Sequence, residues 1–585
     1  MGNVFRFSGT TAKSVYGILV ALVFVCMGAA NSSGQVRPDA GTLLQEQKRN
    51  EPPQLTPFTP FEAPEKERAP LEETGMKFVV KGFRFTGYEG LATAAELEGV
   101  VKDAVGQEMG LANLRRVADR VTKYLHKRGW FLARAYIPQQ DIKDGIVEIA
   151  IVAGRLQGGA VIRGENLRIS ESVLQNMAGS AVKEGGAANQ QDITRSLLLM
   201  NDLPGIRASS TLEPGESPGA AALVVEAKEG PLLDGRIWGD NYGSRYTGSW
   251  RGNGFLEVND PLRYGDQLVL NTTDNPDYQY GQAAYNFPIG YSGLRGTVYY
   301  NEMRYAVDND LIPLDLNGGS RVAGASISYP VVRSRTANLW TSADYNWKNL
   351  WDNALGVPTD NKFINVGSVH LYGDLLDTLL GGGYNTFRTG LTGGSLDLSS
   401  VAANLEVDQQ TARTNGAYGK WTYGASRLQR ICENLNFFMS VNGQLAFDNL
   451  DSSEKFLLGG PNGVRAYPVG EAPGDSGGIF TAEIRYDFPE IKRIGVPQLV
   501  GFYDLGWTTL HESPWANSGT PIGNRNSYTI SGAGIGANLT KTGRYAIRVA
   551  WAAKIGTNPG RSAAGLDADG KNDDNRYWLQ AIVSF

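Results

Sequence analysis

From residue 231 to the C-terminal Phe585, apolar and polar residues alternate one by one within segments of about ten residues. Turn-rich stretches separate these segments, and 338–347 and 438–447 alternate in the same way as 545–555. Successive side chains of a β-strand point to opposite faces, so the pattern predicts strands with one apolar and one polar face. In 545–555 the apolar face carries Tyr545, Ile547, Val549, Trp551, Ala553 and Ile555.

A soluble β-sandwich or propeller would alternate as well, but segment length favours a transmembrane β-barrel. The segments approach the ~9–11 residues that cross a bilayer, whereas soluble strands average about 5–6. Their ends carry Tyr, Trp and Phe, as the aromatic girdles of membrane barrels do. At about 20–24 residues for each strand with its loop, the 355 residues of 231–585 predict about 16 antiparallel strands. The last segment places one row of residues on one face: Tyr577, Leu579, Ala581, Val583 and Phe585.

Two small α+β modules are predicted before the barrel, over 76–154 and 155–229. Each has the order strand, helix, helix, strand, strand, and neither gathers reactive side chains, which favours docking domains over enzymes. In the first module helical spacing is clearest at Leu111, Leu114, Val117, Ala118, Val121 and Leu125. The strands are expected at 77–85, 131–137 and 146–152, then at 156–162, 206–212 and 222–227, with helices of the second module at 171–177 and 192–199.

The first 34 residues are interpreted as a secretory signal peptide. Arg6 and Lys13 precede an apolar run over 15–30 that is followed by small residues. The run is shorter than the ~20 residues of a spanning helix, although a single N-terminal anchor is an alternative and Cys26 is a weak lipoprotein candidate. Residues 35–75 are rich in Pro and charge and are predicted to form a linker with a short helix over 42–49.

Composition excludes several functions. The chain has 55 Lys+Arg against 60 Asp+Glu, so no basic surface supports nucleic-acid binding. Its three histidines, His126, His370 and His511, lie far apart in the sequence and outside recognisable motifs, so we expect no enzyme, no metal site and no cofactor. After signal cleavage only Cys432 remains, and no intrachain disulfide can form.

Over nearly its whole length the sequence resembles the TpsB family. These are the type V outer-membrane transporters of two-partner secretion, which include the haemolysin activation/secretion proteins. Residues 128–138 with 144–149 are similar to the first POTRA domain of that family, and 197–205 with 223–226 to the second. The resemblance implies a barrel of about 16 strands in the Gram-negative outer membrane, two periplasmic POTRA domains, and an N-terminal helix that can plug the pore.

The resemblance also assigns roles to individual residues. The stretch 459–468 looks like the family's sixth extracellular loop, which folds back into the barrel with a Val-Arg-Gly-Tyr tip. Val464, Arg465 and Tyr467 match the tip, whereas Ala466 stands where Gly is usual, so the backbone there must avoid conformations that only Gly tolerates. Downstream, 481–488 and 501–506 look like inner-wall strands. By resemblance, Arg465 pairs with Asp504, and Glu483 is a secondary candidate.

The expected function is passive protein transport through the porin-like channel. The partner is expected to be an unfolded exoprotein with an N-terminal secretion domain, captured in the periplasm and delivered to the cell surface. Outer-membrane lipid and the barrel assembly machinery are further partners, the latter through an insertion signal at Tyr577, Leu579, Val583 and Phe585. Replacing Arg465 with Ala should leave a stable barrel but block secretion. An insertase for other outer-membrane proteins is the main alternative, and a small-molecule porin and an outer-membrane enzyme are the others.

Overall fold

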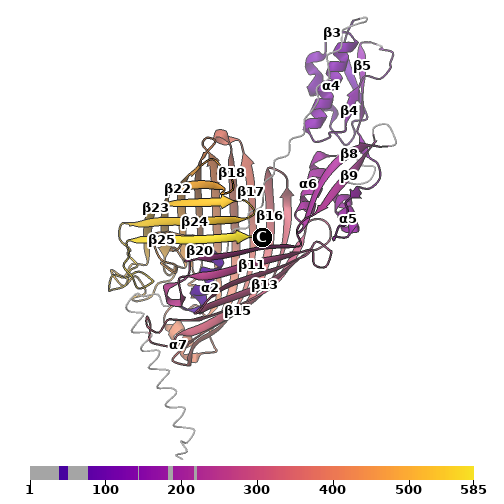
Figure 1. Cartoon of the computed structure of the whole chain (residues 1–585). Coiled ribbons are helices and arrows are strands. Elements are labelled where there is room, and N and C mark those ends of the chain that lie inside the picture. The colour runs from indigo at the N-terminus through magenta and orange to yellow at the C-terminus, as the bar shows by residue number, and fades with distance from the viewer. Residues whose placement is uncertain (1–37, 51–76, 143, 182–188, 216–219) are drawn as a thin grey trace, which may run out of the picture.

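The structure is a computed structural model, and it describes residues 38–50, 77–142, 144–181, 189–215 and 220–585. The predicted signal peptide, 1–34, and most of the predicted linker therefore lie outside the described residues. Figure 1 shows a β-barrel and, beside one end of it, two small α+β modules. None of the described helices is long and apolar enough to cross a membrane.

The first module packs two helices on a three-stranded sheet of order β2-β5-β4. The prediction of one strand over 77–85 is wrong, because Val80 is fully buried and its backbone bonds to Gly106 and Gln107, which divides the segment between two sheets. The elements are β1 (Phe78–Val79), β2 (Gly82–Thr86), α3 (Ala94–Val101), η1 (Lys102–Ala104), β3 (Glu108–Met109), α4 (Leu111–Lys127), β4 (Arg134–Tyr136) and β5 (Ile146–Val152).

The second module repeats the order of the first with a different core. Strand β9 is central, with β6 and β7 parallel on one side and β8 antiparallel on the other. The strand predicted over 156–162 is interrupted, and Gly158 lies at the break with a φ of 74°. The elements are β6 (Arg155–Leu156), β7 (Val161–Arg163), α5 (Glu171–Ala181), α6 (Gln190–Asn201), β8 (Ile206–Pro214) and β9 (Ala220–Glu229).

The remaining chain forms a closed barrel of 16 antiparallel strands, which confirms the predicted strand number. Neighbours in sequence are neighbours in space, and β10 pairs with β25 to close the sheet. The strands are β10 (Leu233–Asp240), β11 (Arg251–Asn259), β12 (Gln267–Asn275), β13 (Tyr278–Pro288), β14 (Arg295–Ala306), β15 (Asn317–Arg333), β16 (Ala337–Ala354), β17 (Val357–Asp377), β18 (Gly383–Asp397), β19 (Gly416–Arg430), β20 (Leu435–Ala446), β21 (Ser476–Asp487), β22 (Val496–Thr509), β23 (Ser527–Lys541), β24 (Tyr545–Ile555) and β25 (Asn575–Ser584).

Five neighbouring strands are much longer than the predicted ten residues, since β15 to β19 run over 15 to 21 residues each. The turn between β16 and β17 explains part of this length. Leu355 and Gly356 both have positive φ, of 50° and 72°, as a two-residue hairpin turn requires, so pairing continues to the tip. A further helix, α7 (Ala402–Gln410), lies in the loop after β18.

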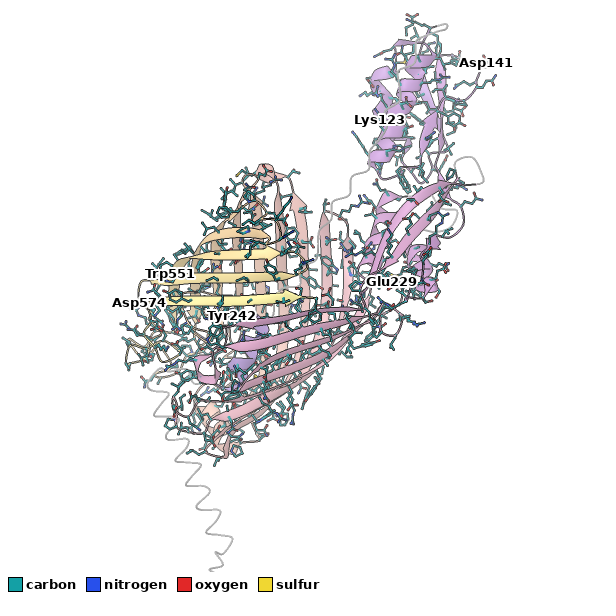
Figure 2. The ribbon with its side chains drawn as sticks, in the orientation of Figure 1. Lys123, Asp141, Glu229, Tyr242, Trp551 and Asp574 are labelled. Atoms are coloured by element: carbon teal, nitrogen blue, oxygen red, sulfur yellow. The ribbon has the colours of Figure 1, made fainter. Side chains whose placement is uncertain are left out.

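The second module contacts the barrel at the turns of one end. Asp202, just after α6, pairs with Arg333 at the end of β15 at 2.7 Å. Arg195 donates to the carbonyl oxygen of Pro330 at 2.7 Å. Glu229, labelled in Figure 2, lies at the junction between module and barrel and pairs with Arg168. These contacts define a module end of the barrel and, opposite to it, a far end that carries the loops after β14, β16 and β18.

Helix α2 (Ala40–Asn50) lies inside the barrel, which confirms the short helix predicted over 42–49 (Figure 1). Its apolar face packs Ala40, Leu43 and Leu44, none more than 2% exposed, against the inner wall of the barrel. The wall residues in this cluster include Tyr278, Tyr280, Met303, Tyr305 and Leu350. Because these wall residues point inward, the alternate residues on the same strands point outward.

Candidate functional site

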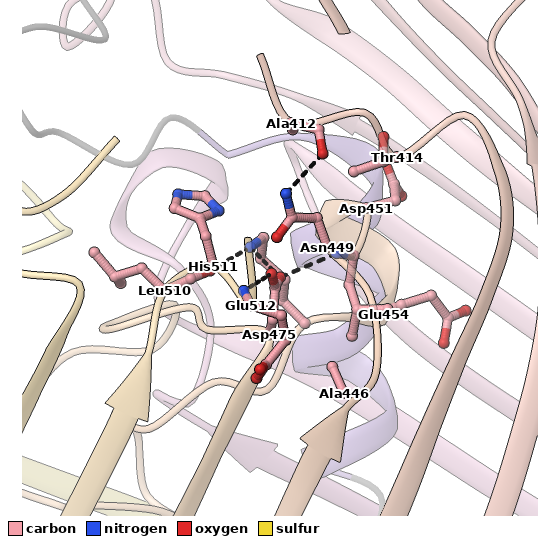
Figure 3. Close-up of polar contacts among 12 residues, drawn as sticks. Ala412, Thr414, Ala446, Asn449, Asp451, Glu454, Asp475, Leu510, His511 and Glu512 are labelled. Atoms are coloured by element: carbon pink, nitrogen blue, oxygen red, sulfur yellow. Dashed lines mark hydrogen bonds and ion pairs between the residues drawn. The ribbon is translucent and has the colours of Figure 1, made fainter. Parts of the chain in front are cut away.

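One long loop, residues 447–475 between β20 and β21, folds into the barrel and is called the inserted loop below. Val464, Ala466 and Tyr467 at its tip are all 0% exposed. Figure 3 shows the root of the loop, where the carboxylate of Asp475 accepts from the backbone nitrogens of Leu450 and Glu512 at 3.1 and 3.0 Å. These contacts tie the two ends of the loop to each other and to the neighbouring loop.

Arg465 at the tip binds both acidic residues that the resemblance singled out. Its Nε and Nη2 donate to the two oxygens of Asp504 at 2.8 Å each, and its Nη1 donates to Glu483 at 2.7 Å. The backbone nitrogen of Arg465 also donates to Asp504, at 3.1 Å. Thr481 and Asp504 are paired across β21 and β22, and the Thr481 hydroxyl donates to the same carboxylate at 3.0 Å. We call this arrangement the loop lock.

The loop lock is a buried, fully hydrogen-bonded ion pair. The side chain of Asp504 is 0% exposed and that of Arg465 is 14% exposed. The guanidinium also lies over the ring of Phe502, with 3.4 Å from Cζ to the ring centroid. A planar fork that binds one carboxylate at two points fixes both distance and orientation. Removal of one partner from such a pair costs about 3–5 kcal/mol, because the other charge stays buried.

The barrel wall next to position 466 has room for the side chain of Ala466, which stands where the family usually has Gly. Ala466 is not among the residues with positive φ, so this position has no need of glycine. Gly532 on β23 faces it, and a methyl group at position 532 would lie 2.4 Å from the Cβ of Ala466. The bare backbone of Gly532 therefore makes the space that the side chain of Ala466 fills.

Further contacts hold the inserted loop, and the sequence offered no sign of them. The indole nitrogen of Trp578, on the last strand, donates to the carbonyl oxygen of Arg465 at 2.8 Å. The ammonium of Lys554 lies 5.3 Å from the ring centroid of Tyr467. Glu471 accepts from the Asn558 side chain and from the Ala568 backbone at 2.9 and 2.8 Å, which links the inserted loop to the loop before β25.

Helix α2 is joined to the inserted loop by two side chains, since the Gln45 amide donates to the carbonyl oxygen of Ser453 and Arg49 makes a larger set of contacts. The guanidinium of Arg49 donates to the carbonyl oxygens of Gly459, Leu458 and Asn462 at 3.1, 3.2 and 3.0 Å, and it also donates to that of Leu457. A guanidinium carries five N–H donors, so it can satisfy several carbonyl groups of one turn at once. The helix and the loop thus form one connected body in the lumen.

A cavity of about 1570 Å³ lies between this body and the second module. Met177, Leu199 and Leu203 of the module line it at one end, and Arg49, Arg465 and Trp578 line it at the other. Its barrel wall is polar, with inward side chains that include Arg388, Ser440, Asn442, Arg485, Gln498, Asn538 and Arg548. The cavity ends at the helix and the inserted loop, where Arg49 and Arg465 line it.

The other residues named from the sequence have simpler surroundings. Tyr577, Leu579, Val583 and Phe585 point away from the lumen and are 36–68% exposed. His126 contacts the carbonyl oxygen of Ala133 at 3.0 Å through Nε2. Among the described residues no three or more His, Cys, Asp and Glu side chains are grouped as metal ligands would be.

A closed 16-stranded barrel filled by a helix and an inserted loop, with α+β modules at one end, defines an outer-membrane transporter of proteins. Comparison with known families agrees: the model of the haemolysin secretion/activation protein family ShlB/FhaC/HecB matches residues 219–539, and that of the ShlB-type POTRA domain matches residues 78–154. The chain belongs to the ShlB/FhaC/HecB family. It is a transporter of two-partner secretion in the outer membrane, with its α+β modules in the periplasm.

Individual relatives are distant but extend over most of the chain. The heme/hemopexin transporter protein HuxB of Haemophilus influenzae strain 86-028NP is 24% identical over 98% of this chain and 99% of its own. The outer membrane transporter CdiB of Escherichia coli O6:K15:H31 is 24% identical over 73% of this chain and 72% of its own. Family members are transporters, which agrees with the expectation of a non-enzymatic protein.

Two solved structures share the fold. CdiB from Escherichia coli superposes with a TM-score of 0.71 and 19% identity, covering 100% of both chains. CdiB from Acinetobacter baumannii gives a TM-score of 0.64 and 17% identity, covering 93% of this chain and 96% of its own. Because the α+β modules of this family lie in the periplasm, the module end of the barrel faces the periplasm and the far end faces outside the cell.

Proposed function

We propose that an unfolded exoprotein enters the barrel from the second module and crosses the lumen after the inserted loop and α2 have left their places. The observation that carries this proposal is the cavity. It runs from apolar side chains of the module, Met177, Leu199 and Leu203, to the loop lock at Arg465. Among the described residues, the helix and the inserted loop lie between that cavity and the far end of the barrel, so opening requires their displacement.

Capture in the periplasm is proposed to occur by strand addition. Strand β8 pairs with β9 on one side, and no other described strand pairs with its second edge. Its side chains from Arg207 to Glu213 are largely half-buried or exposed. The Asn201 side chain bonds to the backbone N–H and C=O of Ala208 on this edge. Beyond Ala208 the edge offers main-chain donors and acceptors to an extended peptide whatever its sequence. Such binding suits an unfolded chain that must later be released.

In this proposal the loop lock, formed by Arg465 with Asp504 and Glu483, can open and close, so that it controls the position of the inserted loop. A lock built on one guanidinium keeps the inserted loop in one position at rest, and the loop leaves when an entering chain competes for the same wall. Since Arg49 attaches α2 to the same loop, we propose that helix and loop move together. Folding of the exoprotein outside the cell then makes transport directional, because the periplasm offers no ATP.

The cargo is proposed to be a large exoprotein with an N-terminal secretion domain, encoded beside this gene. HuxB, which aligns over 98% of the chain, is named a heme/hemopexin transporter. An exoprotein that binds haem or hemopexin is therefore the first cargo to test. We also propose that the barrel assembly machinery inserts this barrel through its last strand, which ends in Phe585 and exposes Tyr577, Leu579 and Val583 outward.

The test is secretion of the neighbouring exoprotein by a host that lacks both genes. The intact transporter should release it to the surface or medium, whereas Arg465→Ala and Asp504→Asn should retain it in the periplasm. Heat-dependent gel migration checks that each variant barrel is folded. Exposed Arg525→Gln, in a loop at the far end, is the control variant. Normal secretion by both lock variants would contradict the proposed role of the lock.

The same strains separate this function from that of an insertase. Deletion of the gene should abolish secretion of one exoprotein and leave the levels of other outer-membrane proteins unchanged. A general fall in those levels, with secretion unaffected, would instead support the insertase. An exoprotein without its secretion domain should stay inside the cell with every variant, because capture depends on that domain.

A further inference from the structure

On the outer surface of β14 to β17, the type of side chain changes from one row of paired residues to the next along the barrel axis. Register pairs Tyr300, Ala323, Trp347 and Asn365 into one row across the four strands. The next row toward the far end is Glu302, Arg321, Asn349 and Phe363, and the one after it is Arg304, Gly319, Trp351 and Asn361. An aromatic row is thus followed directly by two rows that carry charge and amides.

These rows face outward at the extracellular end. On β14 the alternate residues Asn301, Met303 and Tyr305 are buried and point into the barrel, so Glu302 and Arg304 point away from it. Strand β14 starts near the module end and leads into a loop at the far end, which places residues 302–304 on the extracellular side. Aromatic residues mark the membrane–water interface of a barrel. The charged rows therefore lie at the level of the lipid headgroups.

The arginines of these rows are held in fixed positions. Glu302 accepts from Nε and Nη2 of Arg304 at 3.0 and 2.8 Å and from the hydroxyl of Tyr300 at 3.0 Å. Nε of Arg321 lies 3.6 Å from the same carboxylate, and its guanidinium lies 5.1 Å from the ring centroid of Trp351. The side chains of Arg304 and Arg321 nevertheless remain 65% and 47% exposed, so donors on both are open to a ligand.

A groove of about 560 Å³ runs between them. Its lining includes Arg304, Arg321, Asn349, Trp351, Asn353 and Asn361. Gly319 lies next to the groove, and a Cβ there would meet the backbone oxygen of Met303 at 2.4 Å and the indole of Trp351 at 2.6 Å, so only glycine lets that ring lie across the strand. With Asn317 and Asp360, which also line it, the groove combines two guanidinium groups, four side-chain amides, one carboxylate and the flat face of Trp351.

We propose that this groove binds the headgroup of a phosphorylated glycolipid of the outer leaflet, a lipopolysaccharide. Guanidinium groups bind phosphate at two points and are less strongly hydrated than ammonium groups. Side-chain amides supply the hydrogen-bond donors and acceptors that sugar hydroxyls need. A Trp side chain with one apolar and one solvated end is typical of the membrane interface. Asp360 also lines the groove, but it pairs with Lys362 at 3.0 Å. The two arginines against Glu302 therefore leave a net positive site, which complements an anionic headgroup. Acyl chains of the same lipid would then lie along the apolar surface below, at Val298 and Tyr345.

The test is native mass spectrometry of the full-length transporter in detergent, titrated with rough-type lipopolysaccharide. Arg304→Gln/Arg321→Gln and Trp351→Ala should each lower the bound fraction at least fivefold. The control variants are Arg525→Gln, an exposed loop arginine, and Trp421→Ala, an outward tryptophan on β19 that is 37% exposed. Both controls should bind as the intact protein does. Heat-dependent gel migration confirms that every compared barrel is folded.

Two comparisons of ligands decide the chemistry. Dephosphorylated lipopolysaccharide should bind at least fivefold more weakly than the intact form, and inorganic phosphate at millimolar concentration should compete only weakly. Equal binding by the groove variants and the intact protein would overturn the proposal. So would phosphatidylglycerol binding as tightly as lipopolysaccharide, because the site would then be a general anionic-lipid surface. Competition by inorganic phosphate as strong as that by lipopolysaccharide would overturn it as well.

Discussion

The indole nitrogen of Trp578 donates a hydrogen bond of 2.8 Å to the backbone carbonyl oxygen of Arg465. The tip of the inserted loop is therefore held by the last strand of the barrel as well as by Asp504 on β22. Tyr242, just after β10, packs edge-on against the same indole at 5.9 Å between ring centroids. The first and last strands meet at this point, so the position of the loop and the closure of the barrel share one side chain.

Trp578→Phe should loosen the loop without disturbing the barrel. The variant keeps an aromatic ring but leaves the carbonyl of Arg465 without its donor, at a cost of about 1–3 kcal/mol for a buried group. We expect more frequent channel openings in planar bilayers, and reduced secretion if the loop must return to its place. Trp551→Phe is the matched control, since Trp551 points outward on β24 (Figure 2). Identical opening frequencies in both variants would remove Trp578 from the locking machinery.

Gly532→Ala should displace the tip of the inserted loop. The new methyl group would lie 2.4 Å from Cβ of Ala466, and overpacking of this kind costs about 1–3 kcal/mol. Ala466→Gly removes the opposing group, so the double variant Gly532→Ala/Ala466→Gly should restore secretion and the resting conductance. Gly501→Ala, on β22 with open space around it, is the control. A double variant no better than Gly532→Ala alone would show that the two positions are not in competition.

The sequence predicts those features of the structure that depend on residues close together in the chain better than those that depend on distant residues. Alternation in 545–555 predicts β24 to the residue, and helical spacing from Leu111 predicts α4, because both patterns reflect which side of a local element is buried. Lengths of β15 to β19 were underestimated, since pairing beyond the membrane depends on partner strands and on turns such as Leu355–Gly356.

The residues that hold the inserted loop also differ in whether the sequence predicts them. The resemblance named Arg465, Asp504 and Glu483, and the structure brings these three side chains into contact. Other contacts of the inserted loop involve residues far apart in the sequence. Three of them are hydrogen bonds between a side chain (Trp578, Arg49 or Glu471) and a backbone atom about a hundred or more positions away. Nothing in the local sequence marks such partners, because a single indole or guanidinium has the same spacing pattern whether it faces lipid, water or a loop.

Asp202→Asn should weaken attachment of the second module to the barrel. The carboxylate of Asp202 accepts from Nε and Nη2 of Arg333 at 2.9 and 2.7 Å, and an amide cannot form the same paired contact. We expect faster proteolysis at the junction near Gly230 and at least a twofold loss of secretion. Asp103→Asn is the control, because Asp103 forms a similar two-point pair with Arg120 on the first module, away from the barrel. Equal proteolysis rates for the two variants would argue against this docking contact.

The contact made by Glu471 should make the inserted loop sensitive to pH. Burial, together with the nearby negative charge of Asp567, raises the pKa of Glu471 from its ordinary value to about 7. A carboxyl group whose pKa is raised in the folded state favours folding when protonated. That contribution is complete below the ordinary pKa of about 4.3 and is lost as the pH rises through about 7. The loop should therefore be held less firmly in mildly alkaline buffer than in mildly acidic buffer.

The measurement is the frequency of channel opening in planar bilayers, recorded from about pH 6 to about pH 8, the interval in which Glu471 loses its proton. Openings of the intact protein should become several times more frequent across that interval. Glu471→Gln stays neutral and can still accept from Asn558, so its opening frequency should stay nearly constant. Glu406→Gln, an exposed substitution on α7, should keep the pH dependence of the intact protein. Persistence of the full pH dependence in Glu471→Gln would assign it to another group.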